Sequence, residues 1–520
     1  MQDSAGTTTS RLDAIRREQE DTSSHLPARY AGVLIHPTSL PGPYGSGDLG
    51  QGVFDLLDWL ALARVTRWQV LPLGPTGYGD SPYQCFSAFA GNPVLIGLDS
   101  LVADGLLTPD DLSGASFSSN HVDYGAVLPW RMARLRLAAE RFREHPDANL
   151  RQEYSVFRAE QITWLEDYAL FMALKGEHDG HSWLEWPEAL RLRERSALAE
   201  ARERLAAEVD IQRFLQFLFF RQWNAVRQRA NALGIRIIGD IPIFVALDSA
   251  DVWANPHLFQ LHPSGEPRAV AGVPPDYFSA TGQLWGNPLY DWEALEQTGY
   301  LWWIERFRAI YRTVDIVRVD HFRGFEAYWT VSYGETTAIR GRWEGGPGSR
   351  MFDAVRSALG HTAVIAEDLG VITDAVEQLR VSLGFPGMKV LQFAFGFGDR
   401  NVYLPHHHTI DSVVYSGTHD NDTSVGWYAN TEDSVRDHLR RYLSVDGNDV
   451  AWDLIRCAMQ SVAETAVVPA QDILSLGSEA RMNLPGSAGG NWGWRVQPGA
   501  LGNAHAARLR NLIELYGRTG

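Results

Sequence analysis

The chain has 520 residues, 45% hydrophobic and 21% charged, and 63 acidic against 46 basic side chains give a formal charge of −17. These proportions are typical of a globular protein that is long enough for several domains or for one barrel with insertions. The acidic balance argues against binding to nucleic acid or to an anionic membrane, because phosphates are held by clustered Lys and Arg. It favours a neutral or cationic small substrate.

The N-terminal segment and the cysteines indicate the compartment. Residues 1–28 are polar and charged and lack the apolar segment of a signal peptide, so we expect a mobile tail. The two cysteines, Cys85 and Cys457, cannot form a disulfide framework, and a reducing cytosol is the simplest setting. No run of 18 apolar residues is present, so we expect a cytoplasmic protein without a membrane span.

Eight strand-like apolar runs follow one another along the chain, each ending in polar, Gly or Pro residues. They are Ala31–His36, Trp68–Leu73, Ile235–Asp240, the runs that begin at Val314, Ala363 and Val413, Met388–Phe395 between the last two of these, and Val467–Leu474. Helical patterns fill several gaps, for example Gly52–Leu62, Trp303–Tyr311 and Ala375–Leu383. Eight alternating units predict an α/β fold, a (β/α)8 TIM barrel.

Two intervals between the predicted strands are too long for simple crossovers. Residues 79–234 are rich in Ala, Leu, Arg and Glu and predict a largely helical block, whereas 246–300 is loop-rich with many Gly, Pro and aromatic residues. We interpret both as insertions on the catalytic face of a barrel that occupies 29–520.

Three of the predicted strands lead directly into an acidic residue: Asp320, Glu367 and Asp420. A carboxylate at the end of a buried strand is costly unless the protein uses it. In barrels and doubly wound sheets, the carboxyl edge of the strands is where chemistry takes place. Three acids at three strand ends therefore predict one shared pocket.

Cleavage of a glycosidic bond is a reaction that such acids can carry out, since it needs one protonated and one ionised carboxyl group. Arg318 lies two residues before Asp320, so both point to one face of a strand, and the guanidinium favours the ionised form that suits a nucleophile. Glu367 ends an apolar run, where burial would raise its pKa and keep the proton of a general acid. A purely structural ion pair between Arg318 and Asp320 remains an alternative.

Aromatic residues support a sugar substrate. The chain has 18 Trp and 18 Tyr, whose flat apolar faces and polar edges match the faces and hydroxyl rims of sugars, although a large core can also use aromatics. Tyr83, Tyr277, Phe278 and Trp285 lie in Gly/Pro/Ser-rich segments. We interpret the loop with Tyr277 and Phe278 as a sugar-stacking lid, or alternatively as a loop folded onto the insertion.

A metal-dependent barrel hydrolase is a competing hypothesis. Five potential ligands lie at strand ends, namely His36, Asp240, His321, His419 and Asp420. The first strand offers no second histidine at i+2, however, and no His-Glu-x-x-His helix occurs. Histidines that bind substrate hydroxyls explain the same residues without a metal. A non-catalytic glucan-binding protein would keep the aromatics and need no acid pair.

Several segments occur together in one order along the chain, namely His36–Gly45, Asp80–Gln84 with Gly91–Pro93, Gly239–Val245, Ala271–Tyr290, Arg318–Gly324, Ala366–Gly370, Gly417–Thr423, Arg481–Gly486 and Gly490–Trp492. In this order they resemble the 4-α-glucanotransferases, the amylomaltases or disproportionating enzymes of glycoside hydrolase family 77.

The resemblance implies a barrel related to that of the α-amylases, no required cofactor, and retaining transfer of α-1,4-glucan segments between maltooligosaccharides or amylose- and glycogen-type chains. It implies Asp320 as nucleophile, Glu367 as acid/base and Asp420 as transition-state stabiliser. The sugar-binding residues that it implies are Tyr83, Asp240, Tyr277, Phe278, Trp285, Arg318, His321, His419 and Asn491.

The three acids by themselves do not distinguish a transferase from a hydrolase, because both would form a glucosyl enzyme on Asp320. Water is present at about 55 M, whereas a well-oriented bound acceptor reaches an effective molarity of ~10⁵ M or more. An acceptor sugar therefore reacts in preference to water where its binding sites are formed and the groove is covered. The expectation of transfer rather than hydrolysis depends mainly on the resemblance.

Overall fold

Eight parallel strands form the centre of the molecule in the computed structural model, which describes residues 28–144, 147–275, 279–360, 362–487 and 489–520. Their order in the sheet is β10-β11-β12-β1-β2-β3-β6-β9. The Ala366 N–H donates to the Pro386 carbonyl, 2.9 Å away beside β10, and so joins the two ends of the sheet into a barrel. The strands are β1 (Tyr30–Leu34), β2 (Arg67–Gln69), β3 (Arg236–Pro242), β6 (Ile316–Asp320), β9 (Val364–Ala366), β10 (Gly387–Val390), β11 (Ser412–Tyr415) and β12 (Thr465–Pro469).

Each of the eight predicted runs overlaps one of these strands, so the TIM-barrel prediction is confirmed. The strands β2, β10 and β12 end well before the predicted runs do. After β10 and β12 the chain continues as a 3₁₀ turn (Leu391–Phe393) and as α18 (Ala470–Ile473). Asp472 therefore lies on a helix, where it accepts hydrogen bonds from Ser416 Oγ and from Ser424. These tertiary contacts could not be deduced from the apolar run alone.

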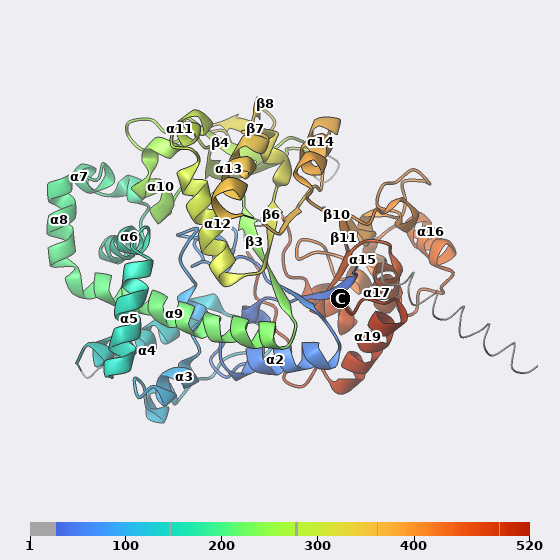
Figure 1. Cartoon of the computed structure of the whole chain (residues 1–520), viewed down its shortest axis with the longest axis horizontal. Coiled ribbons are helices and arrows are strands. Elements are labelled where there is room, and N and C mark those ends of the chain that lie inside the picture. The colour runs from blue at the N-terminus through green and yellow to red at the C-terminus, as the bar shows by residue number, and fades with distance from the viewer. Residues whose placement is uncertain (1–27, 145–146, 276–278, 361, 488) are drawn as a thin grey trace, which may run out of the picture.

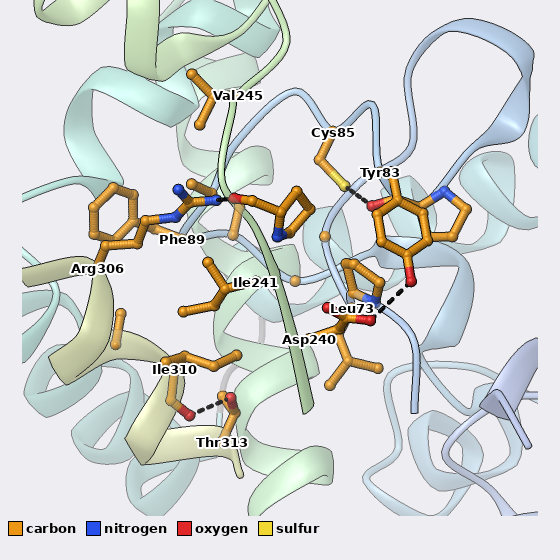
Figure 2. Close-up of a pocket in the computed structure, with 18 of the residues that line it drawn as sticks. Leu73, Tyr83, Cys85, Phe89, Asp240, Ile241, Val245, Arg306, Ile310 and Thr313 are labelled. Atoms are coloured by element: carbon orange, nitrogen blue, oxygen red, sulfur yellow. Dashed lines mark hydrogen bonds between the residues drawn. The ribbon is translucent and has the colours of Figure 1, made fainter. Parts of the chain in front are cut away.

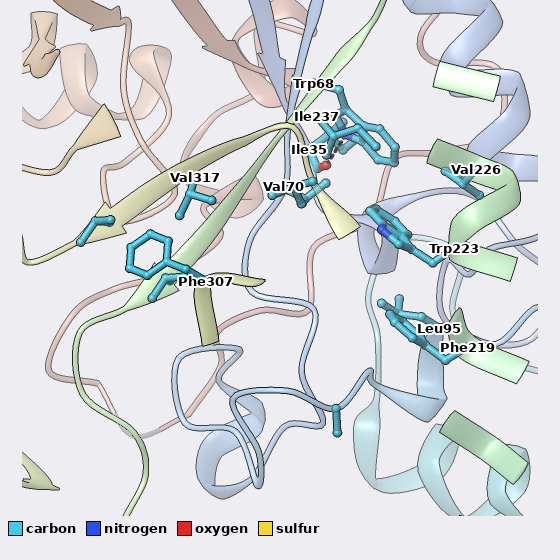
Figure 3. Close-up of a cluster of buried hydrophobic side chains, with 14 of the residues drawn as sticks. Ile35, Trp68, Val70, Leu95, Phe219, Trp223, Val226, Ile237, Phe307 and Val317 are labelled. Carbon is cyan, nitrogen blue, oxygen red and sulfur yellow. Dashed lines mark hydrogen bonds between the residues drawn. The ribbon is translucent and has the colours of Figure 1, made fainter. Parts of the chain in front are cut away.

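Helices pack around the outside of the barrel. Helices α2, α9 and α12 follow one another on one side, α13 and α14 continue this layer, and α17 and α19 pack beside β12 and α2. Figure 3 shows part of the outer core, where Trp68 and Ile237 of the barrel face Trp223 and Val226 of α9. The helices are α2 (Gln51–Leu62), α3 (Leu98–Ala103), α4 (Tyr124–Glu144), α5 (Ala148–Glu160), α6 (Leu165–Glu177), α7 (Glu188–Arg191), α8 (Arg195–Arg204), α9 (Ala206–Ala232), α10 (Ala250–Ala254), α11 (Trp292–Gln297), α12 (Leu301–Thr313), α13 (Ser349–Leu359), α14 (Asp374–Leu383), α15 (Ser424–Asn430), α16 (Asp433–Leu443), α17 (Val450–Gln460), α18 (Ala470–Ile473) and α19 (Asn503–Leu515).

Alternate residues of the strands enter two different cores, as the two-residue period of a strand requires. On β6, Val317 and Val319 belong to the outer core beneath the helices. Ile316 packs instead against the cluster inside the barrel, with Ile238 and Ile365 from the neighbouring strands. Residues in phase with Ile316 therefore point inward, which places functional side chains at the inner rim.

A second sheet lies outside the barrel and is antiparallel, in the order β5-β4-β7-β8. Its strands are β4 (Ala269–Val273), β5 (Gln283–Pro288), β7 (Ala327–Ser332) and β8 (Gly341–Gly345). Two strands thus come from the predicted loop-rich interval 246–300 and two from the connection after β6. Our sequence analysis missed this sheet, because its strands are short and interrupted by Gly.

The interval 79–234 contains many helices, and α4 to α8 form a block beside the barrel (Figure 1). Aromatic rings hold this block to α9, with Phe142 stacked on Phe214 at 4.2 Å between centroids and Tyr154 edge-on to both rings. Over the described ranges, no helix has both the length and the apolar composition that crossing a membrane requires.

Candidate active site

Strand register brings two of the three predicted acids together. Strands β3, β6 and β9 are neighbours, and Val319 of β6 pairs with Ala366 of β9. The next residue on each strand is an acid, Asp320 and Glu367. The Glu367 N–H donates to the Val319 carbonyl at 3.0 Å, so the two strands stay paired up to the acids. Both carboxyl groups therefore lie at the same carboxyl edge of the barrel.

Asp320 is held by the arginine that precedes it by two residues. Arg318 Nη1 lies 2.9 Å from Asp320 Oδ1 and 2.6 Å from Asp240 Oδ2, and Arg318 and Asp240 are almost completely buried. The prediction that Arg318 and Asp320 share a face is therefore confirmed. The side chain of Asp320 keeps 28% of its surface exposed, which leaves one side of the carboxylate open to the groove.

Glu367 has a more enclosed environment. Its Oε2 accepts from the His321 N–H at 2.7 Å and its Oε1 from the Leu369 N–H at 2.9 Å, so the peptide backbone fixes the plane of the carboxyl group. Burial raises the pKa of Glu367 to about 8, and the nearby charge of Asp320 adds to this effect, whereas Arg318 and the two N–H donors oppose it. The carboxyl group is therefore protonated at neutral pH.

Asp420 lies in the turn after β11 and approaches from another side. Asn483 Nδ2 donates to Asp420 Oδ1 at 2.6 Å, and Arg481 Nη2 donates to the Asp420 carbonyl at 2.7 Å. His419 Nε2 lies 3.4 Å from Asp420 Oδ2. The carboxylate stays 45% exposed, so one oxygen is anchored while the other remains available to a ligand.

Tyr83 forms an aromatic wall next to these acids. Its hydroxyl donates to Asp240 Oδ2 at 2.8 Å, as Figure 2 shows. Its ring stacks on His419 with centroids 5.1 Å apart, and Trp492 lies 5.9 Å from the same ring. Tyr83 thus connects the end of β3 to the turn that carries Asp420.

Trp285 and His321 form a second aromatic wall near the acids. Trp285 lies on β5 rather than in a loop, and its ring meets that of His321 edge-on at 4.8 Å. His321 itself has a left-handed backbone (φ 51°), which turns the chain sharply after β6 and brings its N–H to Glu367. Burial, with a smaller contribution from Arg323, lowers the pKa of His321 to about 3, so the imidazole is neutral.

Several buried polar atoms at this site have no hydrogen-bond partner among the described residues. They are Asp240 Oδ1, His321 Nε2, His419 Nδ1 and His36 Nδ1. A buried polar group without a hydrogen-bond partner costs about 1–3 kcal/mol. A polar ligand that forms hydrogen bonds with these atoms would therefore remove this cost. The surroundings of Asp240 also raise the pKa of its carboxyl group. Burial is the main cause and the charge of Asp320 adds to it, whereas Arg318 opposes the shift.

Comparison with known proteins identifies the family. The model of glycoside hydrolase family 77, described as 4-alpha-glucanotransferase, matches residues 35–501. The chain belongs to this family. It is 52% identical over 494 residues to the 4-alpha-glucanotransferase of Thermus thermophilus, covering 94% of this chain and 98% of that protein, and 51% identical to that of Synechocystis, covering 95% and 99%. Its activity is that of a 4-alpha-glucanotransferase.

A solved structure of a family member has the same fold. The amylomaltase from Streptococcus agalactiae in complex with acarbose superposes with a TM-score of 0.92 at 36% identity, over 94% of this chain and 99% of that one. The amylomaltase from Corynebacterium glutamicum, at 18% identity, has a TM-score of 0.75, covering 93% of this chain and 75% of that one, and supports the fold alone.

The remaining candidate residues are not all found with a free polar group beside the acids. Asn491 lies in an exposed loop where its amide is already used, since Oδ1 accepts from the Leu484 N–H and Nδ2 donates to the Ser487 carbonyl. Tyr277 and Phe278, the predicted lid, lie outside the described residues. Across the described ranges, no group of three His, Cys, Asp or Glu side chains has a metal-binding arrangement.

Two residues with clear contacts at the site were not among our candidates. Asn483 anchors Asp420, and Trp492 packs on Tyr83 and His419. Both lie in the C-terminal segments that match the family pattern. Their location in these segments was the signal that could have identified them as site residues. No strand or motif spacing, however, connected these residues to the acids.

Proposed function

We propose that this 4-alpha-glucanotransferase works by a retaining double displacement, with Asp320 as nucleophile and Glu367 as acid/base. Asp320 attacks the anomeric carbon while Glu367 gives its proton to the leaving glycosidic oxygen, which leaves a β-linked glucosyl enzyme. Glu367, now ionised, takes a proton from the 4-hydroxyl of an acceptor glucan as that oxygen displaces Asp320. One α-1,4 bond breaks and one forms, so the exchange is nearly neutral in free energy.

The contrast between the two carboxyl groups is the observation that carries this proposal. Retaining glycosidases need one protonated and one ionised carboxyl group beside the scissile bond. Glu367 is buried with a raised pKa, whereas Asp320 is partly exposed and 2.9 Å from a guanidinium. The two groups therefore have different surroundings before substrate binds, and burial favours the protonated form that the acid role of Glu367 requires.

The unpartnered polar atoms support a sugar in the adjoining space. Asp240 Oδ1, His321 Nε2 and His419 Nδ1 would hydrogen-bond the hydroxyls of the glucosyl unit whose bond is cleaved. Asp420, with one oxygen held by Asn483, would stabilise the positive charge that develops at the anomeric centre. Tyr83 and Trp285 would stack on sugar rings on either side.

Further expectations stay proposals. The substrates would be maltooligosaccharides and longer amylose- or glycogen-type glucans, and the enzyme would act in the cytoplasm. Residues 79–234 and 246–300 would be insertions in a barrel of residues 29–520, after a tail of residues 1–28. Tyr277 and Phe278 would cover the groove and shape the use of acceptors, and Asn491 would bind substrate.

Active-site variants with an activated donor test the assigned roles. Maltotriosyl fluoride carries a leaving group that needs no protonation, so Glu367→Gln should still form the glucosyl enzyme and accumulate it, whereas Asp320→Asn should not form it. With maltotriose, both variants should lose about 10³-fold or more of the transfer rate. Mass spectrometry detects the adduct, and its location on Asp320 is read by peptide mapping.

Two results would contradict the proposal. Turnover of maltotriose by Asp320→Asn at the wild-type rate would remove the nucleophile assignment. An adduct that forms in Asp320→Asn as fast as in the wild type would place the covalent bond elsewhere. Adding a chelator to the wild-type assay tests the metal hypothesis, because a metal-independent double displacement keeps its full rate.

A further inference from the structure

We propose that the hydrogen bond between Gln84 and Asn287 sets the spacing of the two aromatic walls and thereby suppresses hydrolysis in favour of transfer. The bond joins the hairpin that carries Tyr83 to the strand that carries Trp285. The inference depends on the proposed glucosyl-enzyme mechanism, because it concerns which nucleophile reaches that intermediate. Gln84 and Asn287 are positioning residues and take no part in bond making.

Tyr83 stands on a short hairpin between β2 and the helical block. The Phe86 N–H donates to the Pro75 carbonyl at 2.9 Å and the Gly77 N–H donates to the Gln84 carbonyl at 2.8 Å, which pairs the two arms. Tyr83 reaches Asp240 from this hairpin, and the adjacent Gln84 extends to β5. Its Nε2 donates to Asn287 Oδ1 at 3.2 Å.

Asn287 is a junction with both halves of its amide in use. The side chain is 5% exposed, its Nδ2 donates to the Val245 carbonyl at 2.9 Å, and its Oδ1 accepts from Gln84. These opposite requirements fix the orientation of the amide. Asn287 follows Trp285 by two residues on β5, so the bond acts next to the second aromatic wall.

The Gln84–Asn287 bond closes a ring of contacts around the catalytic pair. On one side, Tyr83 donates to Asp240, which shares Arg318 with Asp320. On the other side, Trp285 packs on His321, whose N–H donates to Glu367. Asp320 and Glu367 meet through the pairing of β6 and β9. A shift between the hairpin and β5 would therefore move the two walls relative to the acids.

The other contacts of the hairpin indicate why this bond matters for its position. The base of the hairpin is attached to the same insertion twice, since the Ala250 N–H donates to the Phe86 carbonyl at 2.9 Å and the Ala88 N–H to Asp251 Oδ2 at 2.7 Å. A cavity of about 80 Å³ lies beside the hairpin and is lined by Tyr83, Cys85 and Val245 among others (Figure 2). Packing does not fill this space, so the position of Tyr83 depends more on polar contacts.

The choice between transfer and hydrolysis is sensitive to small displacements. A bound acceptor competes with water only while its hydroxyl is held in line with the reacting carbon, and a 1 Å misplacement can cost about 10²-fold. Water needs no such positioning. Loosening the walls should therefore reduce transfer strongly and hydrolysis weakly, which raises the ratio of hydrolysis to transfer.

The count of reducing ends separates the two reactions. Disproportionation of maltotriose conserves reducing ends, whereas each hydrolytic event adds one. Gln84→Met removes the donor and keeps the length of the side chain, and we expect the ratio of hydrolysis to transfer to rise about tenfold, with a larger change in kcat for transfer than in KM. The double variant Gln84→Met/Asn287→Ala should match the worse of its two single variants, because both lose the same contact.

Two further variants make the result specific. Gln222→Met is a matched control in α9, because Gln222 is a buried glutamine that bonds Gly97 through both ends of its amide. It should lower thermal stability and leave the ratio unchanged. Asn287→Asp loses the donor to Val245 but keeps an oxygen for Gln84, so its ratio should rise less than that of Gln84→Met.

The outcomes distinguish this inference from the proposed function. An unchanged ratio in folded Gln84→Met, or an equal rise in Gln222→Met, overturns the positioning role. A larger rise in Asn287→Asp than in Gln84→Met also overturns it, because the bond to Val245 would then be the important one. Failure of the Asp320 and Glu367 assignments would appear separately, in the adduct experiment, where Gln84 is unaltered.

Discussion

The ends of β6 and β9 are adjacent and each carries one acidic residue, yet the two residues have different environments. At the end of β6, Asp320 is partly exposed and lies against a guanidinium from its own strand. At the end of β9, Glu367 is buried and receives two backbone N–H groups. Burial at the end of β9 raises the pKa of Glu367 and favours its neutral form.

The difference shows how a barrel sets two identical functional groups to different tasks. Local sequence supplies the cation at β6, since the strand period places residues two apart on one face. Burial at β9 has a different origin, because it depends on neighbouring strands and on the turn at His321. Substitutions at Arg318, Asn483 and Glu367 test how far the activity and stability depend on these environments.

Removing the cation of β6 should have the largest effect. Arg318→Met leaves Asp240 and Asp320 without their shared partner, and breaking a buried ion pair costs about 3–5 kcal/mol. We expect the rate of glucosyl-enzyme formation to fall about 10³-fold, as measured in single turnover. Because this variant can also unfold, Arg318→Lys is the second measurement. It keeps the charge but not the geometry that reaches both acids, and a wild-type rate in folded Arg318→Lys would contradict the role of the bridge.

A weaker effect is expected from the anchor of the third acid. Asn483→Ala removes the 2.6 Å hydrogen bond to Asp420, and a hydrogen bond to a charged group is worth about 1.5–3 kcal/mol. We expect kcat/KM for maltotriose to fall by about tenfold or slightly more. Asn430→Ala is the matched control, since Asn430 is exposed and contacts only Ser478 among the described residues, at 3.4 Å. Equal activities of the two variants would show that Asp420 needs no anchor.

The smallest effect is on stability and concerns β9. The pKa of Glu367 is raised in the folded state, so its contribution to stability is fully present below the unfolded pKa and is lost as the pH rises through the folded value of about 8. Glu367→Gln removes this loss, so the stability of the variant relative to the wild type should be greater at pH 8 than at acidic pH. Thermal unfolding of both proteins at pH 8 and toward pH 4 measures this difference. A difference that does not vary with pH would contradict the buried proton.

Much of this site could be predicted from the chain. The apolar runs that lead into Asp320 and Glu367 marked strand ends, and the two-residue spacing of Arg318 predicted the ion pair that the structure contains. The direction of the pKa shift at Glu367 also followed from the apolar run before it. These features are local, and a strand of fixed period converts spacing directly into geometry.

Other features needed contacts between distant segments. Trp285 was expected in a loop but lies on β5, because β4 pairs with β7 from the far side of β6. Asn483 reaches Asp420 across 63 positions of the chain, and Gln84 reaches Asn287 across 203. The periodic pattern of apolar residues along the chain carries no information about such long-range contacts.

The sequence alone therefore determined the barrel, the acids at its rim and the arginine partner of Asp320, since these depend on hydrophobic pattern and strand period. The tertiary structure decided which walls face the acids and how they are held apart. Those contacts arise only when the insertions fold back onto the barrel, where burial and unpaired polar atoms, rather than local spacing, select the partners.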